Sequence, residues 1–340
     1  MALVSVPVSE IEKLAKSALL NHGACEDTAR IMAHAVARAE ADGNSICGMF
    51  YVPIYCEHLD CGRINKNANI TLTSTLASVI KVDADNGFAH PAIEVGLPAL
   101  IKATQKTGCA SLAINHSYNC AALGLYTEQL SRNGLIAMGF ANAPASIAPP
   151  GGKRPVIGTN PVAMSVPDGN GGVAFQFDQS TSAVAKTWII AAAQKGEAIP
   201  LGWAIDSDGE PTTNAQEALD GAIAPFGGYK GFGIGLMVET FAALMSGAAL
   251  STEASRFVGR KGGFPNVGQF FIALDPKAYV TGDNYAAQTS KLCHNITTQD
   301  GARLPCSRAL NTRTESKIKG VMVDKELLEK VHKLTRTNNR

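Results

Sequence analysis

The feature that most limits the fold of this 340-residue chain is a change of pattern at Cys109. Before Cys109, apolar residues recur at helical spacing, which predicts helices over residues 9–22, 27–42 and 92–106. Glycines follow these three segments, as is typical of helix ends. After Cys109, short β-rich runs alternate with helix-like segments and with clusters of Gly, Pro and Asn. The chain is therefore expected to be an α/β protein with a helical N-terminal part.

The later part of the chain is expected to supply most of a sheet. We predict strands over residues 110–114, 135–140, 161–166, 173–177 and 269–274. We predict helices over residues 121–132, 182–194 and 231–245, and a last helix from Asp324 onward.

The composition is that of a globular protein with a sizeable core. Hydrophobic residues make up 46% and charged residues 17% of the chain, and the net charge is +1. This balance excludes the basic footprint of a nucleic-acid-binding protein. The N-terminal residues lack the basic region of a secretory signal, and no apolar run reaches the length of a membrane span. We therefore expect a cytoplasmic protein with no membrane partner.

The eight cysteines show no metal-binding spacing. They are scattered without a C-x-x-C pair, and we expect reduced thiols and no metal site. Neither a P-loop nor a G-x-S-x-G elbow is present. The glycine run over residues 231–235 (GFGIG) leads into a predicted helix without a preceding strand, so it does not indicate a Rossmann dinucleotide site.

Three loops carry residues suited to an anionic ligand. Residues 149–161 (PPGGKRPVIGTNP) combine glycines with Lys153 and Arg154, which suits either an anion site or a solvated turn. Residues 177–182 (FDQSTS) suit either a helix cap or a ligand site. Lys230 lies at a glycine-rich helix entry, where the helix dipole disfavours a cation. A bound phosphate would remove that conflict, so we favour a functional role for Lys230.

Taken together, five motifs resemble the malate/L-lactate dehydrogenase-like NAD(P)H-dependent oxidoreductases. The motifs are AINHSYNCAALGLY, GTNPVAMSVP, FDQSTSAVA, GGYKGFGIGLMVE and GARLPCSR. Two of them are most similar to the Δ1-piperideine-2-carboxylate/Δ1-pyrroline-2-carboxylate reductase branch. The resemblance implies a non-Rossmann α/β fold with a central mixed, largely antiparallel sheet. It also implies a homodimer and a nicotinamide cofactor, NADPH or alternatively NADH.

The resemblance also implies domains and cofactor-binding residues. Residues 1–117 with 290–340 would form the substrate and dimerisation domain, and residues 118–289 the NADPH-binding domain. Arg303 and Arg308 would add positive charge for the cofactor's phosphates. The implied cofactor-binding residues are Asn119, Cys120, Ala121, Ala122, Leu123, Asp178, Gln179, Ser180, Lys230, Gly231, Leu304, Pro305, Cys306, Ser307 and Arg308.

The chain departs from the family at its acid/base positions. Aligned on Gly48, the family's Ser, His and Arg are replaced by Ile46, Cys47 and Tyr51. The family's Ala-Arg-Gly followed by an acidic residue is replaced by Ala185 and the run Lys186, Thr187 and Trp188. Many relatives have a His at the position of Asn119, whereas this chain has His116.

These substitutions define the candidate site and its alternatives. Tyr51, Cys47, His116 and Lys186 are candidate catalytic residues, and Ile46, Thr159, Thr187 and Trp188 are candidate substrate contacts. Cys47, His116 and Trp188 are also each compatible with a packing role.

The chemistry of hydride transfer ranks three hypotheses for function. A protonated imine needs little further acid help, whereas a ketone needs a proton donor. The leading hypothesis is therefore an NADPH-dependent reductase of a cyclic imine in a specialised biosynthetic pathway. One alternative is a 2-oxo acid/2-hydroxy acid dehydrogenase that uses Lys186 and His116. The other is a cofactor-binding protein without redox turnover.

Overall fold

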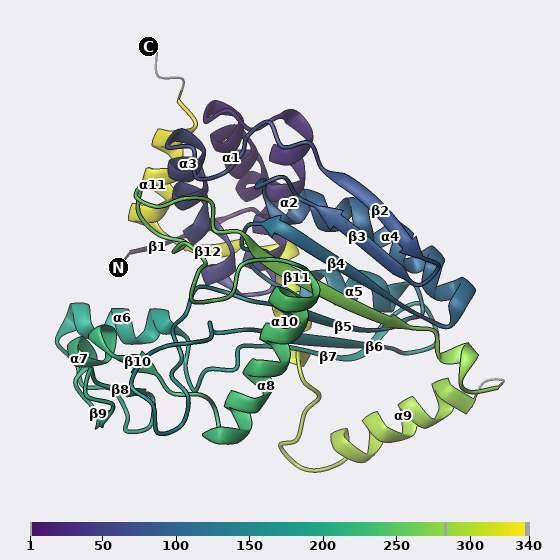
Figure 1. Cartoon of the computed structure of the whole chain (residues 1–340). Helices are drawn as coiled ribbons and strands as arrows, with labels where there is room; N and C mark the ends of the chain where they lie inside the picture. Colours follow the sequence, from purple (N-terminus) through teal and green to yellow (C-terminus); the bar gives the residue numbers. More distant parts are fainter. Residues whose placement is uncertain (1, 282–283, 337–340) are drawn as a thin grey trace.

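The computed structural model describes residues 2–281 and 284–336. Residues 1, 282–283 and 337–340, which belong to the two predicted domain ranges, lie outside the described residues. The centre of the molecule is one seven-stranded sheet with the strand order β2-β3-β4-β11-β5-β6-β7 (Figure 1). Its strands are β2 (Thr71–Leu76), β3 (Val79–Asp83), β4 (Cys109–Ser117), β5 (Ile136–Ala141), β6 (Val162–Pro167), β7 (Val173–Gln179) and β11 (Val267–Leu274).

The prediction of a mixed, largely antiparallel sheet is confirmed. Strands β3 and β4 pair in parallel, and all other neighbours in this sheet are antiparallel. The parallel pair is joined by α4 (Ala89–Thr107), which supplies the long crossover that parallel strands require. Gly108 ends α4 with a φ of +80°, a conformation that glycine adopts without strain.

Helices cover both faces of the sheet. On one face, α4 and α5 (Gly124–Arg132) bury a core around Ile93, Leu100 and Phe271. On the other face, α8 (Tyr229–Glu239) and the π-helical turn Thr240–Met245 pack Val238 and Ala242 against Phe140 and Phe270. The central strands are thus covered on both sides, which fits their apolar sequences.

The N-terminal helices form a separate layer. This layer contains α1 (Val8–Asn21), α2 (Glu26–Ala41), α3 (Val52–Asp60) and α11 (Lys325–Leu334), closed by the strand pair β1 (Leu3–Val6) and β12 (Val321–Asp324). Ser9 lies inside α1 and does not cap it, because the helix begins one residue after Pro7. Two short 3₁₀ turns, Ser45–Cys47 and Met49–Tyr51, lead from α2 into α3.

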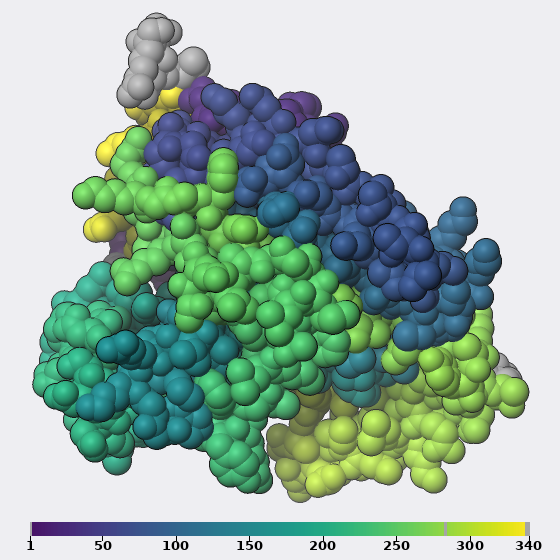
Figure 2. Space-filling model, in the orientation of Figure 1, coloured from purple at the N-terminus to yellow at the C-terminus, as the bar shows by residue number. Residues whose placement is uncertain are grey.

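Two further parts project from the central layers in Figures 1 and 2. A small lobe contains α6 (Lys186–Lys195), α7 (Ala215–Asp220) and the three strands β8 (Ala204–Ile205), β9 (Pro211–Thr212) and β10 (Ala222–Ile223). The predicted helix over residues 182–194 therefore begins four residues later than expected. At the opposite edge lies α9 (Asn284–Thr297), which is followed along the chain by α10 (Ser307–Lys319). No helix within the described ranges is long and apolar enough to span a membrane.

Candidate active site

The segment after α2 is held in place by a buried carboxylate. Glu40 accepts a hydrogen bond of 2.7 Å from the backbone N–H of Met49. A Cβ atom at Gly48 would lie 2.3 Å from Oε1 of Glu40, so any side chain there would displace the Glu40 carboxylate from this position. Burial raises the pKa of Glu40 above its usual value, and the bond from Met49 partly opposes that shift. Glu40 and Gly48 together direct Cys47 and Tyr51 toward the sheet.

The sequence-predicted residues converge on one cavity of about 340 Å³, here called the Tyr51 cavity. It lies between the two 3₁₀ turns, the loop after β4 and the ends of β6 and β7. Its lining includes ten predicted site residues, namely Ile46, Cys47, Tyr51, Asn119, Cys120, Ala121, Thr159, Asp178, Gln179 and Ser180. The described residues that line it include no His, Lys or Arg.

The thiol and phenol groups of the Tyr51 cavity, those of Cys47 and Tyr51, are weak acids. Burial and the charge of Asp178 raise the pKa of Cys47 to about 12, although a hydrogen bond with Asn44 counters the rise. Burial and the neighbouring Cys47 raise the pKa of Tyr51 to about 12, although a hydrogen bond with Asn119 counters the rise. Tyr51 also stacks on Tyr55, with ring centroids 5.3 Å apart. Both groups therefore carry their protons at neutral pH, and Cys47 is not a thiolate nucleophile.

Asp178 is the carboxylate of this cavity. Its side chain is open to the cavity, yet the surrounding protein desolvates it and raises its pKa to about 6. Its Oδ2 accepts a 2.8 Å hydrogen bond from the N–H of Gly124, the first residue of α5, and this bond opposes the rise. Asp178 thus supplies the negative charge that a helix N-terminus favours. A Cβ at Gly124 would lie 3.0 Å from that of Asp178, so glycine lets α5 approach β7 closely.

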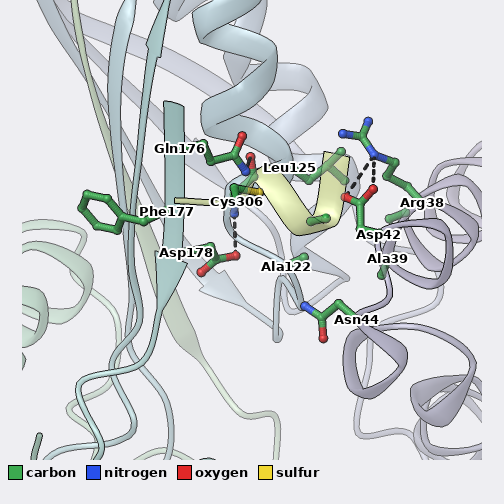
Figure 3. Close-up of a pocket in the computed structure, with 13 residues that line it drawn as sticks. Arg38, Ala39, Asp42, Asn44, Ala122, Leu125, Gln176, Phe177, Asp178 and Cys306 are labelled. Atoms are coloured by element: carbon green, nitrogen blue, oxygen red, sulfur yellow. Dashed lines mark hydrogen bonds and ion pairs between the residues drawn. The ribbon is translucent and has the colours of Figure 1, made fainter. Parts of the chain in front are cut away.

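A second cavity of about 250 Å³, here called the Asp42 cavity, adjoins the first because both are lined by Asn44 and Asp178. Figure 3 shows Asp178 and Cys306 on one side of it and Arg38 and Asp42 on the other. Three of the predicted cofactor residues, Ala122, Asp178 and Cys306, line it.

The backbone around these cavities is unusual at two predicted cofactor residues. Ala121 has a φ of +53° and Cys306 a φ of +63°, a region that residues other than glycine seldom adopt. The side chain of Asn119 accepts a 2.6 Å hydrogen bond from the N–H of Ala121 and stabilises the first of these. Strained backbone of this kind is concentrated at ligand sites.

The GTNP loop is held by a buried network. Asn160 donates a 2.8 Å hydrogen bond to Glu239 of α8, and Glu239 accepts a 2.6 Å bond from the hydroxyl of Ser251. Asn160 itself has a φ of +34°. This network places the neighbouring Thr159 in the lining of the Tyr51 cavity.

Several predicted site residues do not line the Tyr51 or Asp42 cavity. His116 lies at the end of β4, where its Nδ1 pairs with Asp83 at 2.9 Å. Trp188 is 63% exposed on α6. Lys186 lines a different cavity, and Thr187 next to it has a buried hydroxyl with no hydrogen-bond partner in the described structure.

The predicted cofactor residues of α8 and α10 lie mostly outside the two cavities as well. Lys230 is exposed in the first turn of α8, as predicted for the helix entry. A Cβ at Gly231 would lie 2.0 Å from the carbonyl oxygen of Phe226, so this glycine is required for packing. Cys306 lines the Asp42 cavity. The described residues that line either cavity do not include the other predicted residues of this segment, which are Leu304, Pro305, Ser307 and Arg308.

Other residues that line the two cavities were not predicted from the sequence. Asn44, Phe257 and Gln269 line the Tyr51 cavity, and Arg38 and Asp42 line the Asp42 cavity. None of them belongs to a chemically distinctive motif. The one local signal for Asp42 was its position. It is a carboxylate at the end of a predicted helix, directly before the segment GNSIC, and a helix C-terminus disfavours a negative charge.

Comparison with known proteins identifies the family. The malate/L-lactate dehydrogenase family model matches residues 6–332. The chain belongs to this family. Its relatives are oxidoreductases, and the chain is therefore assigned to that enzyme class.

The relatives include the predicted imine-reductase branch. The chain is 36% identical to a Δ1-pyrroline-2-carboxylate reductase of Ancylobacter novellus over 97% of both chains. It is also 36% identical to a (2R)-3-sulfolactate dehydrogenase (NADP⁺) of Chromohalobacter salexigens, over 91% of this chain and 92% of the relative. The resemblance to this family inferred from the motifs is thus confirmed.

A solved structure confirms the fold class. The Δ1-piperideine-2-carboxylate reductase of Pseudomonas syringae matches with a TM-score of 0.91 and 32% identity, covering 97% of this chain and 99% of that chain. The non-Rossmann α/β fold predicted from the motifs is therefore correct.

Proposed function

We propose that this chain is an NADPH-dependent reductase of the C=N bond of a cyclic imine. The observation that carries the proposal is the chemistry of the Tyr51 cavity, where Tyr51 and Cys47 are weak acids and no His or Arg is present among the described lining residues. A protonated imine already carries its positive charge and needs little acid help during reduction. The names of the relatives support the same substrate class.

Asp178 is the residue that would favour an iminium over a ketone. Its carboxylate, open to the cavity, would attract the positive charge of a protonated imine when ionised. Thr159 and Asn119 would hydrogen-bond the substrate from opposite walls, and Ile46 would pack on its ring. Tyr51 would donate a hydrogen bond to the bound substrate.

The residues present fit a nicotinamide cofactor. We assign the cofactor to the Asp42 cavity and to the loop 119–123, because the strained Ala121 and Cys306 border the region where the two cavities adjoin. When bound, NADPH supplies the hydride. The exposed Arg303, Arg308 and Lys230 would bind its phosphates, including the 2′-phosphate that NADH lacks, which favours NADPH.

We also propose a homodimer and the predicted division into a substrate and dimerisation domain and an NADPH-binding domain. The support for a dimer is the apolar surface of α8 and the turn that follows it, where Tyr229, Leu236, Leu244 and Met245 are exposed. A cytoplasmic location and a role in a biosynthetic pathway remain predictions from the sequence.

Fluorescence titration and turnover assays test the proposal together. NADPH fluorescence is expected to change on binding, with weaker binding of NADH. Absorbance at the NADPH band is then expected to fall with Δ1-pyrroline-2-carboxylate or Δ1-piperideine-2-carboxylate. Tight NADPH binding without turnover across a panel of imines and 2-oxo acids would favour the cofactor-binding alternative and refute the reductase.

A further inference from the structure

A third cavity, here called the Lys186 cavity, has a volume of about 240 Å³ and lies between the small lobe and the loop after Ser251. Its lining residues are Ala145, Ser146, Pro155, Lys186, Ile189, Ala218, Leu219, Asp220, Gly221, Ala222, Ile223 and Arg256. Two of these are cations and one, Asp220, is a carboxylate. The cavity therefore carries a net positive charge.

The two cations lack partners. In residues 2–281 and 284–336, no carboxylate lies within ion-pair distance of Lys186 or Arg256. The two cations are close enough to affect each other. Partial burial of the ammonium group and, to a smaller extent, the charge of Arg256 lower the pKa of Lys186. Solvent still reaches the Lys186 side chain. Like charges held together in this way repel, and an anion between them would relieve the repulsion.

Ser146 provides an independent sign of a ligand. Its residue is only 8% exposed, and its hydroxyl has no hydrogen-bond partner among the described residues. Its backbone groups are already used, the N–H by Ile157 at 2.8 Å and the carbonyl by Ile223 at 2.9 Å. An unpaired buried hydroxyl is unfavourable, so a polar group of a ligand is expected to satisfy it.

The positive end of α6 lies at the same place. The helix begins at Lys186, and Ala185 before it offers no side chain to cap the first turn. Together with the cations and Ser146, this helix end adds to the positive potential of the cavity.

The Lys186 cavity borders the Tyr51 cavity. Three short segments, residues 143–146, 185–186 and 256–257, contribute lining residues to both cavities. A charged group of a small molecule that reached the wall of the Tyr51 cavity at Ala185 and Phe257 would lie beside the segments that carry Lys186 and Arg256.

Arg63 holds the loop that carries Arg256. Its guanidinium is buried and donates hydrogen bonds to backbone carbonyls of this loop, including Gly259 at 2.6 Å and Gly263 at 3.3 Å, and also to that of Arg256. Arg63 is thus a positioning residue that fixes Arg256 before a ligand binds.

We propose that Lys186, Arg256 and Ser146 form a subsite for a carboxylate of the substrate. The inference rests on the proposed reduction of an imine in the Tyr51 cavity. The subsite explains how this chain can bind a carboxylate although Tyr51 replaces the family's arginine. Recognition of the carboxylate has moved to the wall formed by the small lobe. Arg256 and Ser146 thereby become specificity-determining residues.

Calorimetry on the NADP⁺-bound protein tests the subsite without turnover. Pyrrole-2-carboxylate and its uncharged analogue pyrrole-2-carboxamide serve as probes. In Arg256→Gln and Lys186→Met, the affinity for the carboxylate is expected to fall about 10- to 100-fold, which is the usual effect of losing a charge-assisted hydrogen bond. The affinity for the amide is expected to fall much less. Ser146→Ala is expected to give a smaller loss of the same kind.

Arg260→Gln is the matched control, because Arg260 lies exposed on the same loop and does not line the cavity. It is expected to leave binding of both probes unchanged. Equal losses for carboxylate and amide, carboxylate binding unaffected by either charge variant, or no binding of the carboxylate would each overturn the subsite.

Kinetics separate failure of the subsite from failure of the proposed function. With Δ1-pyrroline-2-carboxylate, Arg256→Gln is expected to raise KM about 10-fold more than it does with uncharged Δ1-pyrroline, and to change kcat little. If no imine is reduced by the native enzyme, the proposed function fails while the calorimetric result still decides the subsite.

Discussion

At the scale of single residues, Cys47 and Tyr51 define what the site can do. The structure places both in the lining of one cavity with Asp178, and burial leaves both protonated at neutral pH. We propose that both act as uncharged wall residues and hydrogen-bond donors. A protonated thiol is a poor nucleophile, so a covalent mechanism through Cys47 is not expected.

Alkylation measures the state of Cys47 directly. At pH 7.5, iodoacetamide is expected to modify the exposed Cys25, whose pKa is lowered by hydrogen bonds from Thr28, at least about ten times faster than Cys47. Peptide mass spectrometry over time gives both rates. A Cys47 that reacts as fast as Cys25 would show that it is a thiolate.

Restoring the family's residues tests whether the loss of these residues determines which class of substrate the chain reduces. The double variant Cys47→His with Tyr51→Arg is expected to raise kcat/KM for a 2-oxo acid about 10- to 100-fold, because it returns a general acid and a carboxylate partner. Phe50→Arg is the control, since Phe50 is exposed and does not line the Tyr51 cavity. A folded double variant with unchanged 2-oxo acid activity would contradict this account of the site.

At the scale of helices and strands, a network of ion pairs holds together the helices beside the Asp42 cavity. Glu128 of α5 is buried and pairs with Arg313 of α10 at 2.9 Å and with Arg132 at 2.9 Å, and it also pairs with Arg38 of α2. Arg313 in turn pairs with Asp42. The network joins three helices that are far apart in the sequence.

The network makes stability depend on pH. Burial opposes ionisation of Glu128, but the hydrogen bond from Arg313 and the charge of Arg38 outweigh it and lower the pKa of this carboxyl. A lowered pKa in the folded state means that Glu128 stabilises the protein above about pH 4.5, and that this contribution is lost as the pH falls through the folded pKa.

Urea unfolding at pH 7 and pH 4 tests the network. Glu128→Gln is expected to lower the free energy of unfolding by about 3 kcal/mol at pH 7, and to reduce the loss of stability between pH 7 and pH 4. The control is Glu315→Gln, which removes an exposed pair with Lys319 and is expected to change stability by less than about 0.5 kcal/mol. Equal effects of the two variants would contradict the role given to Glu128.

The elements show which parts of the fold can be predicted from sequence. Strands β4, β5, β6 and β11 were predicted because their buried residues are mostly apolar. Strand β7 was predicted from apolar residues that are only half-buried in the structure. Strand β2 was missed because it is exposed along its whole length and lacks that pattern. Pairing of β1 with β12 was missed because no local signal connects residues some three hundred positions apart.

The candidate site was predictable to a similar extent. Motifs located the residues that line the Tyr51 cavity, but they placed Lys186 there as well. Lys186 faces a different cavity because α6 begins at that residue and not at Ser182. The sequence did not predict Arg256 and Ser146 as site residues because they are far apart in the chain. They line one cavity only in the folded protein, where the small lobe meets the loop held by Arg63.

At the scale of the whole molecule, the sheet and its two helical layers bring three cavities together. The Asp42, Tyr51 and Lys186 cavities adjoin one another in that order through shared residues or shared segments. The first suits the cofactor, the second the reacting bond and the third an anionic group of the substrate. The chain retains the fold of the family. We propose that its substitutions change substrate recognition within that fold.

The ratio of kcat/KM for Δ1-piperideine-2-carboxylate to that for pyruvate, measured with NADPH on the native protein, tests the central claim most directly. A cavity in which Tyr51 and Cys47 are weak acids, and in which the Asp178 carboxylate attracts a cation, predicts a ratio of at least about 100, because only the iminium brings its own proton. A ratio of one or less would show that the site protonates a ketone efficiently, and would contradict assignment of the chain as an imine reductase.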